Sequence, residues 1–359
     1  MTRVLMTADA AGGVWTYALE LARAHAADGV STTLALMGPR PSPSQLIAAH
    51  GIPGLEIVTS DFQLEWMEAP WDDVAAAGRW LLELESRVQP TVIHLNGYAH
   101  GALPWHAPVV VVGHSCVLSW RDAVGGDFDP RWLDRYRRTI GEGLRAADWV
   151  VTPSRSMLSS LKQHYGPLPR SSIIFNGRSA DRFHRARKEP FVFTAGRLWD
   201  RAKNIEGLRS IAPYLSWPVV AAGDSPRAAD LMQVGRLSES EMADWLARAA
   251  IFALPARYEP FGLSAVEAAL SGCALVLGDI ASQREIWGDA ADFVDPDDHD
   301  ALWTVLDRLI EDDALRHARA AAAHKRAARF NPMDMARNYI RVYGQIAATS
   351  RRRRFACVS

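Results

Sequence analysis

The sequence has few cysteines, little net charge and no long hydrophobic run. Its three cysteines, Cys116, Cys273 and Cys357, are far apart and form no CxxC pair, so neither a disulfide framework nor a cysteine-based zinc site is predicted. A reducing compartment is the simplest setting for such a chain, and we expect it in the cytoplasm. No apolar stretch approaches the roughly 18 residues that span a bilayer, and the apolar start, interrupted at Asp9, is too brief for a signal peptide.

Positive and negative side chains are almost equal in number. There are 40 Lys and Arg residues against 41 Asp and Glu residues, which gives a formal net charge of −1. This balance argues against broad electrostatic binding of nucleic acid. The single charge run extends from Arg351 to Arg354. Because one short cluster without a neighbouring hydrophobic anchor attracts anionic lipid only weakly, the run favours a solvated, disordered tail over 351–359 rather than a membrane contact.

The composition is that of a globular protein, with 48% hydrophobic and 23% charged residues, and the length of 359 residues predicts two domains. Short apolar runs alternate with helical patterns along almost the whole chain, which indicates an α/β fold with parallel strands joined by helices. A polar, basic stretch at 176–190 is typical of a linker. Predicted strands cover residues 3–7, 91–95, 109–112, 149–152 and 173–175 before the linker, and 191–194, 219–222, 251–254, 275–277 and 293–294 after it.

Helices are predicted between these strands. The first begins at Val14, after a glycine pair, and ends at Gly29. Apolar residues from 74 to 88 recur at spacings of three and four, which places them on one helix face before Pro90. From residue 298 to about residue 348 the pattern is helical throughout, and Pro332 begins the final helix.

The segment LPARYEPFGLSAVE at 254–267 is the most informative in the sequence. It is predicted as strand, loop and helix, and ligands bind beyond the carboxyl ends of strands in open parallel sheets, so Glu259 is well placed to meet one. The amides at 261–263 open the helix and suit an anionic or hydroxyl-rich ligand. Ser264 and Glu267 also fit a capping box, in which Glu267 would cap its own helix without any ligand. Glu259 alone is equally consistent with a solvated loop acid.

A second segment, AGRLWDRAKN at 195–204, carries two cations after a predicted strand. Gly196 ends the strand, and Arg197 and Lys203 follow six residues apart, which predicts a positive pocket at the same sheet edge as the first segment. Arg offers a planar fork for phosphate oxygens and Lys a point charge, as a diphosphate requires. Taken alone, both are more often surface charges, with Asp200 as an ion-pair partner; such an exposed pair contributes only about 0–1 kcal/mol.

Together the two segments resemble the retaining glycosyltransferases of family 4, which have the GT-B fold. The resemblance is carried by Glu259 and Glu267, with seven residues between them, and by Gly196-Arg197 with Lys203, and it covers almost the whole chain. Further matches are Gly12-Gly13, Thr152-Pro153-Ser154, Asn176-Gly177, and Glu285-Ile286 with Gly288. The implied fold has two Rossmann-like domains facing across a cleft: an acceptor domain over 1–178, a nucleotide-sugar donor domain over 190–331, and a final helix at 333–349 that returns to the first domain.

The resemblance also implies a role for each site residue. Arg197 and Lys203 would hold the donor diphosphate, Glu259 would meet hydroxyls of the transferred sugar, and Glu267 would accept hydrogen bonds from the ribose. His114, after the predicted strand at 109–112, would face the sugar from the first domain. The remaining donor-binding residues would close around the sugar and phosphate or lie beside the base: Gly12, Gly13, Gly196, Phe261, Gly262, Leu263, Arg236 and Leu237. The departures from the family pattern, Ala256, Asn204 and Cys273-Ala274, touch packing and specificity more than the phosphate site.

The implied chemistry needs no metal or cofactor. Breaking the anomeric bond leaves negative charge on the diphosphate, which Arg197 and Lys203 can stabilise as it develops. No clustered carboxylate or histidine set would hold magnesium, and the acids at 295–298 are predicted as a helix start. In retaining members the acceptor attacks on the face from which the diphosphate departs, and a donor phosphate oxygen takes its proton, so Glu259 is assigned a positioning role. We therefore expect hexose transfer from a UDP- or GDP-sugar to a carbohydrate or other hydroxyl acceptor.

Three other interpretations have different support. A sugar-nucleotide epimerase or hydrolase would use the same phosphate site, and a non-catalytic nucleotide-sugar-binding protein would keep the site without turnover. A dinucleotide-dependent oxidoreductase is disfavoured, because the sequence at 9–13 lacks GxGxxG. His114 taken alone is more often a structural histidine, and only the resemblance places it in the site.

Overall fold

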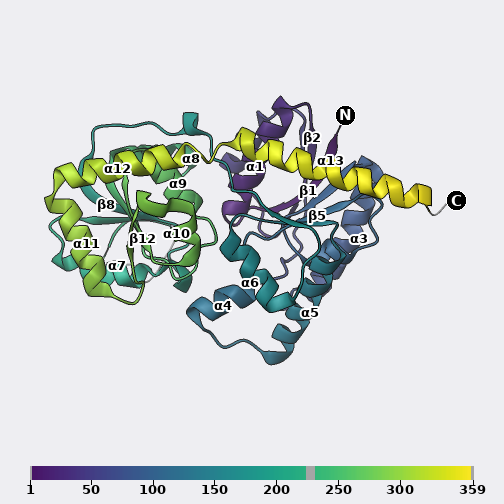
Figure 1. Ribbon diagram of the computed structural model, residues 1–359, viewed down its shortest axis with the longest axis horizontal. Helices are drawn as coiled ribbons and strands as arrows, with labels where there is room; N and C mark the ends of the chain where they lie inside the picture. The colour runs from purple at the N-terminus through teal and green to yellow at the C-terminus, as the bar shows by residue number, and fades with distance from the viewer. Residues whose placement is uncertain (1, 224–230, 357–359) are drawn as a thin grey trace. The chain divides into compact units, whose positions relative to one another are not determined.

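The computed structural model describes residues 2–223 and 231–356, and its contacts divide the chain into two compact units (Figure 1). Unit 1 comprises Met1–Ser119, Gly126–Gly177 and Pro332–Ser359, and unit 2 comprises Trp120–Gly125 and Arg178–Asn331. Each unit is built on its own parallel sheet, as the α/β pattern predicts. In the part of the chain described, no helix has the length and apolar character needed to cross a membrane.

Unit 1 contains a seven-stranded sheet in the order β3-β2-β1-β4-β5-β6-β7. The pairs are parallel throughout, and the order reverses beside β1, the place where ligands bind in such sheets. The centre of the sheet is buried on both faces, which explains apolar runs such as that of β5. The strands are β1 (Arg3–Asp9), β2 (Ser31–Met37), β3 (Leu55–Thr59), β4 (Val92–Leu95), β5 (Val109–Val112), β6 (Trp149–Thr152) and β7 (Ser171–Ile173).

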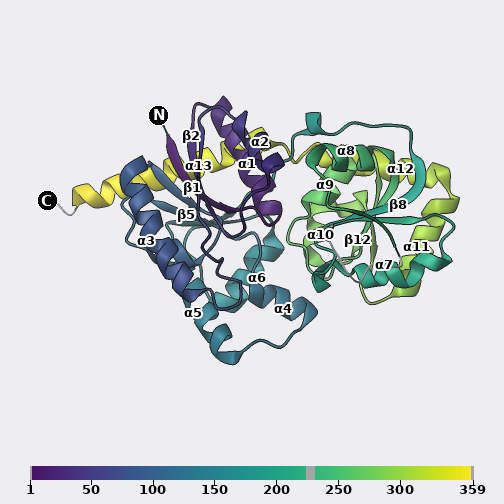
Figure 2. The same cartoon turned by 180° about the vertical axis from the view of Figure 1, so that it is seen from behind.

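Helices cover both faces of this sheet. On one face α1 (Gly13–Ala27) and α13 (Pro332–Ala356) pack in a core with side chains such as Val4 and Met6, and on the other α3 (Trp71–Val88) and α5 (Pro130–Ala146) pack with Leu5. Figure 2 shows α3 and α5 from behind. Val4 and Met6 face one side of the sheet and Leu5 the other because successive side chains of a strand point to opposite faces. The other helical segments are α2 (Pro43–His50), η1 (Ala99–Ala102), α4 (Val117–Val124), whose residues from Trp120 onward group with unit 2, and α6 (Arg155–Tyr165).

Unit 2 contains a six-stranded parallel sheet in the order β10-β9-β8-β11-β12-β13 around its own hydrophobic core. Its strands are β8 (Glu189–Ala195), β9 (Val219–Ala222), β10 (Met232–Gly235), β11 (Ala249–Leu254), β12 (Ala274–Gly278) and β13 (Asp292–Val294). Its helices are α7 (Ile205–Ile211), α8 (Glu239–Arg248), α9 (Leu263–Leu270), α10 (Ala281–Trp287), α11 (His299–Glu311) and α12 (Asp313–Ala327), with short 3-10 segments η2 (Ala180–Arg182), η3 (Arg201–Lys203), η4 (Ala212–Tyr214) and η5 (Gly288–Ala290).

Several sequence predictions of elements were wrong or incomplete. Strands β2, β3 and β10 were not predicted, and β7 ends at Ile173, where the predicted strand begins. The prediction of a disordered tail is wrong over 351–356, because α13 continues through the arginine run to Ala356. Arginine is a good helix former, and no proline or glycine interrupts the run. The last three residues of that predicted tail, 357–359, lie outside the described part of the chain.

Candidate active site

The loops after β8 and β11 bring a lysine and a glutamate together. The two strands are neighbours in register, with Val192 opposite Ile251, so their carboxyl ends meet at one sheet edge. There the Nζ of Lys203 lies 2.5 Å from Oε2 of Glu259, and the two side chains are only 15% and 13% exposed. A cation and a carboxylate are thus held side by side where a ligand with both phosphate and hydroxyl groups can meet them.

Arg197, the other predicted phosphate ligand, lies on the same loop and is more exposed. Its terminal nitrogen is 3.0 Å from Oδ2 of Asp200, and its guanidinium lies over the ring of Trp199. The ion pair considered from the sequence is therefore present. Asp200 is buried and also accepts hydrogen bonds from the indole of Trp120 at 3.0 Å and from the amide of Ala202 at 3.0 Å. These bonds fix the shape of the loop that carries the cations.

Asn204, which ends this loop, explains one departure from the family pattern. It has a left-handed backbone, with φ of 54°, a conformation that favours glycine and that asparagine also tolerates. Its side-chain amide donates to the carbonyl oxygens of Pro255 at 3.0 Å and Pro296 at 2.7 Å. Asparagine therefore joins the cation loop to the loop after β11 as well as making the turn.

The helix after Glu259 begins at Leu263, with Gly262 as its N-cap residue and no side-chain cap. The capping-box interpretation of Ser264 and Glu267 is therefore wrong, because the left-handed Gly262 (φ 89°) starts the helix two residues before Ser264. A Cβ on Gly262 would lie only 3.3 Å from Cγ of Glu259. Glycine at this position thus permits close approach of the acid and the helix amides at 261–263.

The backbone of Glu259 is held by two α10 residues that the sequence analysis missed. Ser282 Oγ donates to its carbonyl oxygen at 2.6 Å, and Gln283 Nε2 donates to the same oxygen and to that of Phe261, both at 3.1 Å. Gln283 is 2% exposed. No local pattern singles these residues out, since they lie more than 20 positions from the loop that they support.

Glu267 contacts an arginine that the sequence analysis also missed. Nε of Arg178 donates to its Oε1 at 2.8 Å, and the terminal nitrogen of Arg178 donates to Oε1 of Glu239 at 2.7 Å. The predicted base-side residues, Arg236 and Leu237, directly follow β10 and precede α8, which begins at Glu239. All of these residues belong to unit 2.

The predicted residues of unit 1 lie around the start of α1 and the end of β5. Gly12 is the N-cap of α1, which begins at Gly13, and a Cβ on Gly12 would meet no atom within 4 Å. His114 Nε2 lies 2.9 Å from Oδ1 of Asn96, and its ring meets that of Tyr17 edge-on at 4.4 Å. Burial lowers the pKa of His114 to about 3, so the imidazole is neutral at pH 7. Because the amide oxygen accepts, Nε2 carries the proton and Nδ1 is the acceptor.

A buried network behind His114 fixes Asn96. The side-chain nitrogen of Asn96 donates to the carbonyl of Thr7 at 2.7 Å, which orients its oxygen towards His114. His94 lies between Tyr17 at 3.1 Å and Tyr343 of α13 at 2.7 Å. Burial lowers the pKa of His94 well below its usual value. The final helix is therefore tied by a hydrogen bond to the strand that precedes Asn96.

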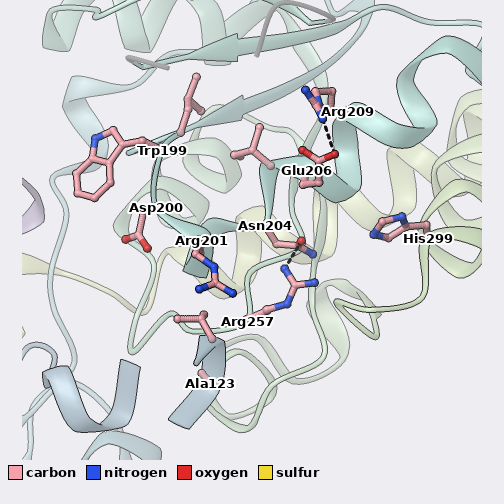
Figure 3. A pocket seen from close by; sticks show the side chains of 12 residues that line it. Ala123, Trp199, Asp200, Arg201, Asn204, Glu206, Arg209, Arg257 and His299 are labelled. Carbon is pink, nitrogen blue, oxygen red and sulfur yellow. Dashed lines mark hydrogen bonds and ion pairs between the residues drawn. The ribbon is translucent and has the colours of Figure 1, made fainter. Parts of the chain in front are cut away.

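A cavity of about 390 Å³ lies beside the cation loop (Figure 3). Asp200, Arg201 and Asn204 line it, together with Arg257 and the start of α7, but Arg197, Lys203 and Glu259 do not. We place the candidate site at the Lys203–Glu259 pair rather than in this cavity, because the pair lies where β8 and β11 end, the edge at which ligands bind in open parallel sheets. The cavity is therefore a neighbour of the candidate site.

In the described residues no group of three or more His, Cys, Asp or Glu side chains is arranged to hold a metal ion. The acids at 295–298 have structural partners. Asp298 caps α11 by accepting from the amide of Ala301 at 2.8 Å, which confirms the prediction of a helix start, and Asp297 pairs with Arg257.

Comparison with known proteins assigns both halves of the chain. A model described as Glycosyltransferase Family 4 matches residues 11–182, and one described as Glycosyl transferases group 1 matches residues 179–326. A D-inositol 3-phosphate glycosyltransferase of Xylanimonas cellulosilytica is 26% identical over 95% of this chain and 93% of its own length. A glycogen synthase of Mycobacterium tuberculosis is 29% identical over 51% of this chain and 50% of its own, so the chain matches about half the length of that relative.

Solved structures agree on the fold. A sucrose-phosphate synthase from Thermosynechococcus elongatus has a TM-score of 0.81 at 17% identity and covers 97% of this chain and 100% of its own. Anabaena Alr3699/HepE in complex with UDP and glucose has a TM-score of 0.75 at 16% identity, with 96% and 100% covered. The chain therefore belongs to glycosyltransferase family 4, with the GT-B fold and a group 1 glycosyltransferase domain in its second half.

Proposed function

We propose that the protein transfers a hexose from a UDP- or GDP-sugar to a hydroxyl acceptor, with retention of configuration and without a metal or other cofactor. The observation that carries this proposal is the Lys203–Glu259 pair at the carboxyl edge of the unit 2 sheet, with Arg197 on the same loop. A nucleotide-sugar has a diphosphate and sugar hydroxyls at adjacent positions, which a paired ammonium and carboxylate can bind together. Support for a UDP donor comes from HepE, which is described with UDP and glucose.

The proposed reaction depends on charge that develops on the leaving group. As the bond between the anomeric carbon and the diphosphate breaks, Lys203 and Arg197 donate to the phosphate oxygens and lower the energy of the transition state. A donor phosphate oxygen takes the proton of the acceptor hydroxyl, which attacks on the face that the diphosphate leaves. Glu259 holds sugar hydroxyls and forms no covalent bond. Fixed donors cost no reorganisation at the moment of reaction, and the hydrogen bonds of Asp200 and Asn204 keep this loop fixed.

The other predicted residues complete the donor site in this proposal. Glu267 accepts from the ribose, Arg236 and Leu237 lie beside the base, and the amides at 261–263 and Gly12-Gly13 approach the phosphate and sugar. Neutral His114 offers Nδ1 as a hydrogen-bond acceptor to a sugar hydroxyl. The open space beside Gly12 supports close approach of a ligand there.

For the acceptor we propose a small cavity of about 50 Å³ in unit 1, at the carboxyl ends of β1 and β4. Asn96, the partner of His114, lines it together with Asp9 and the half-exposed Trp66, whose ring offers a stacking surface for a sugar or cyclitol. The few, widely spaced cysteines, of which Cys116 and Cys273 are buried thiols, support a cytoplasmic setting.

Assay of purified protein with UDP-glucose and GDP-mannose, with and without acceptors, tests the proposal. D-Inositol 3-phosphate and glycogen are suitable acceptors, because two relatives are named D-inositol 3-phosphate glycosyltransferase and glycogen synthase. We expect acceptor-dependent release of nucleoside diphosphate and an α-linked product from an α-linked donor by proton NMR. Release of nucleoside diphosphate without an acceptor would favour a hydrolase, and isomerisation of the donor would favour an epimerase. Tight binding without turnover would favour a non-catalytic binding protein. A product of inverted configuration would contradict a retaining mechanism.

A further inference from the structure

A buried arginine stands between two carboxylates at the point where the chain enters unit 2. Arg178 is 5% exposed and is the first residue of this unit after the crossing from unit 1. Its Nε donates to Glu267 at 2.8 Å, its terminal nitrogen donates to Glu239 at 2.7 Å, and its guanidinium lies 4.9 Å over the ring of Phe183. A guanidinium is a rigid planar fork, so these contacts fix the direction in which each carboxylate lies.

The backbone of Arg178 is fixed as well. Its amide donates to the carbonyl oxygen of Phe330 at 2.9 Å, close to where the chain leaves the unit. The ring of Phe330 packs edge-on against Phe261 at 5.3 Å and Trp287 at 5.9 Å. Arg178 is therefore connected to α9 through its own side chain and, through Phe330, to Phe261 in the loop before that helix. A group held in this way is organised before any ligand arrives.

Glu239, the second partner, begins the helix that follows the loop at 235–237. Ser238 and Glu241 form a capping box that fixes this helix start. Burial raises the pKa of Glu239, but the guanidinium groups of Arg178 and Arg182 outweigh it and hold the pKa below its usual value. Glu239 is therefore ionised at pH 7, and Arg178 joins the helix start beside the predicted base loop to the acid predicted to bind ribose.

We propose that Arg178 is a positioning residue for nucleoside recognition. It orients the Glu267 carboxylate to accept hydrogen bonds from the ribose hydroxyls. Through Glu239 it also holds the loop at 235–237 in a fixed position relative to the ribose. A carboxylate has about four lone-pair sites, so it binds a guanidinium and a diol at once. This inference rests on the proposed function, since it concerns a nucleotide at the unit 2 site.

The test compares the dissociation constants of UDP and 2′-deoxy-UDP by titration calorimetry. Wild-type protein is expected to prefer the ribonucleotide by about 10- to 100-fold, the range for a hydrogen bond to a charged group, and E267A is expected to lose most of that preference. R178K keeps the positive charge but loses the fork, and it is expected to lower the preference at least about threefold. The double variant R178K/E267A should then lose no more than E267A, because the two residues act as one unit.

R182K is the matched control, because Arg182 forms its ion pair with Glu239, at 2.7 Å, and the substitution is the same as in R178K. It is expected to keep the wild-type preference. If R178K does not fold, E239Q gives a second test: Glu239 is 37% exposed, so the variant should fold, and it should lower the preference by weakening one anchor of Arg178.

Four results separate the inference from the proposed function or contradict it. If wild-type protein binds neither UDP nor GDP, the proposed donor site is wrong. If E267A loses the ribose preference while R178K keeps it, the donor site stands and the positioning role of Arg178 is refuted. Equal binding of UDP and 2′-deoxy-UDP by wild-type protein, or an unchanged preference in E239Q, also contradicts the inference.

Discussion

The Lys203–Glu259 pair predicts that substituting either residue costs stability as well as activity. Nζ and Oε2 are 2.5 Å apart, and about six-sevenths of each side chain is buried, since the exposed fractions are 15% and 13%. K203M leaves the Glu259 carboxylate largely buried without its cation. Removing one partner of a buried pair costs about 3–5 kcal/mol, and the remaining exposure places the expected loss at about 2–4 kcal/mol. E259Q should cost a similar amount, because it strands the ammonium.

The double variant K203M/E259Q separates stability from activity. With both charges removed no buried charge is stranded, so the double variant should be more stable than K203M alone. Its transfer rate should stay low, because both groups are needed in the reaction: loss of one transition-state donor reduces kcat by about 10²- to 10³-fold. R197A is the comparison on the same loop: the Arg197 side chain is 46% exposed, and the buried Asp200 carboxylate keeps the hydrogen bonds from Trp120 and Ala202, so stability should fall less than in K203M while kcat falls.

Denaturant unfolding and acceptor-dependent transfer, measured on the same preparations, check this reasoning. We expect recovery of stability without recovery of activity in the double variant. Additive loss of stability in K203M/E259Q, or K203M as stable as wild type, would show that the pair does not carry the buried charge that the structure indicates. Full activity in the double variant would remove both residues from the chemistry.

Three further predictions concern pH, a buried hydrogen bond and metals. Burial lowers the pKa of His25 and His114 to about 3, so between pH 6.5 and 3 the unfolded chain binds more protons than the folded protein. The free energy of unfolding should therefore decrease as the pH is lowered, by up to about 1.4 kcal/mol per pH unit for each histidine. H25Q should reduce this slope in urea unfolding from pH 7 to 4, and an unchanged slope would refute the prediction. Y343F removes the hydroxyl 2.7 Å from His94 and should cost about 1–3 kcal/mol in the same assay; no loss would mean that His94 finds another partner. EDTA should leave the transfer rate unchanged, and loss of the rate with recovery on adding magnesium would contradict a metal-free reaction.

The sequence predicts the buried strands well and the polar or exposed strands poorly. β5 and β11 are continuous apolar runs buried on both faces, and both were predicted. β10 was missed because it is an edge strand with two of its four residues exposed, and β3 is an edge strand with no fully buried residue. β2 is buried, but it begins with Ser31-Thr32-Thr33, which carries no apolar signal.

Site residues could be predicted where they lie close together in the sequence or match a family pattern. Arg197 and Lys203 lie in the segment that follows β8, and Glu259 lies in the loop that follows β11. Because these two parallel strands are neighbours, Lys203 and Glu259 lie at one sheet edge. Arg178 carries no such signal: it reaches Glu239 and Glu267 across 61 and 89 positions. The capping-box error has a similar origin, since a local pattern at 264–267 does not show where the left-handed Gly262 starts the helix.

The most direct test of the central claim is a crystal structure of the protein with UDP or GDP. We expect the terminal phosphate within hydrogen-bond distance of Lys203 Nζ and of the Arg197 guanidinium, with the ribose at Glu267. A diphosphate bound instead in the cavity beside Arg201 and Arg257, with Lys203 still paired only to Glu259, would contradict it.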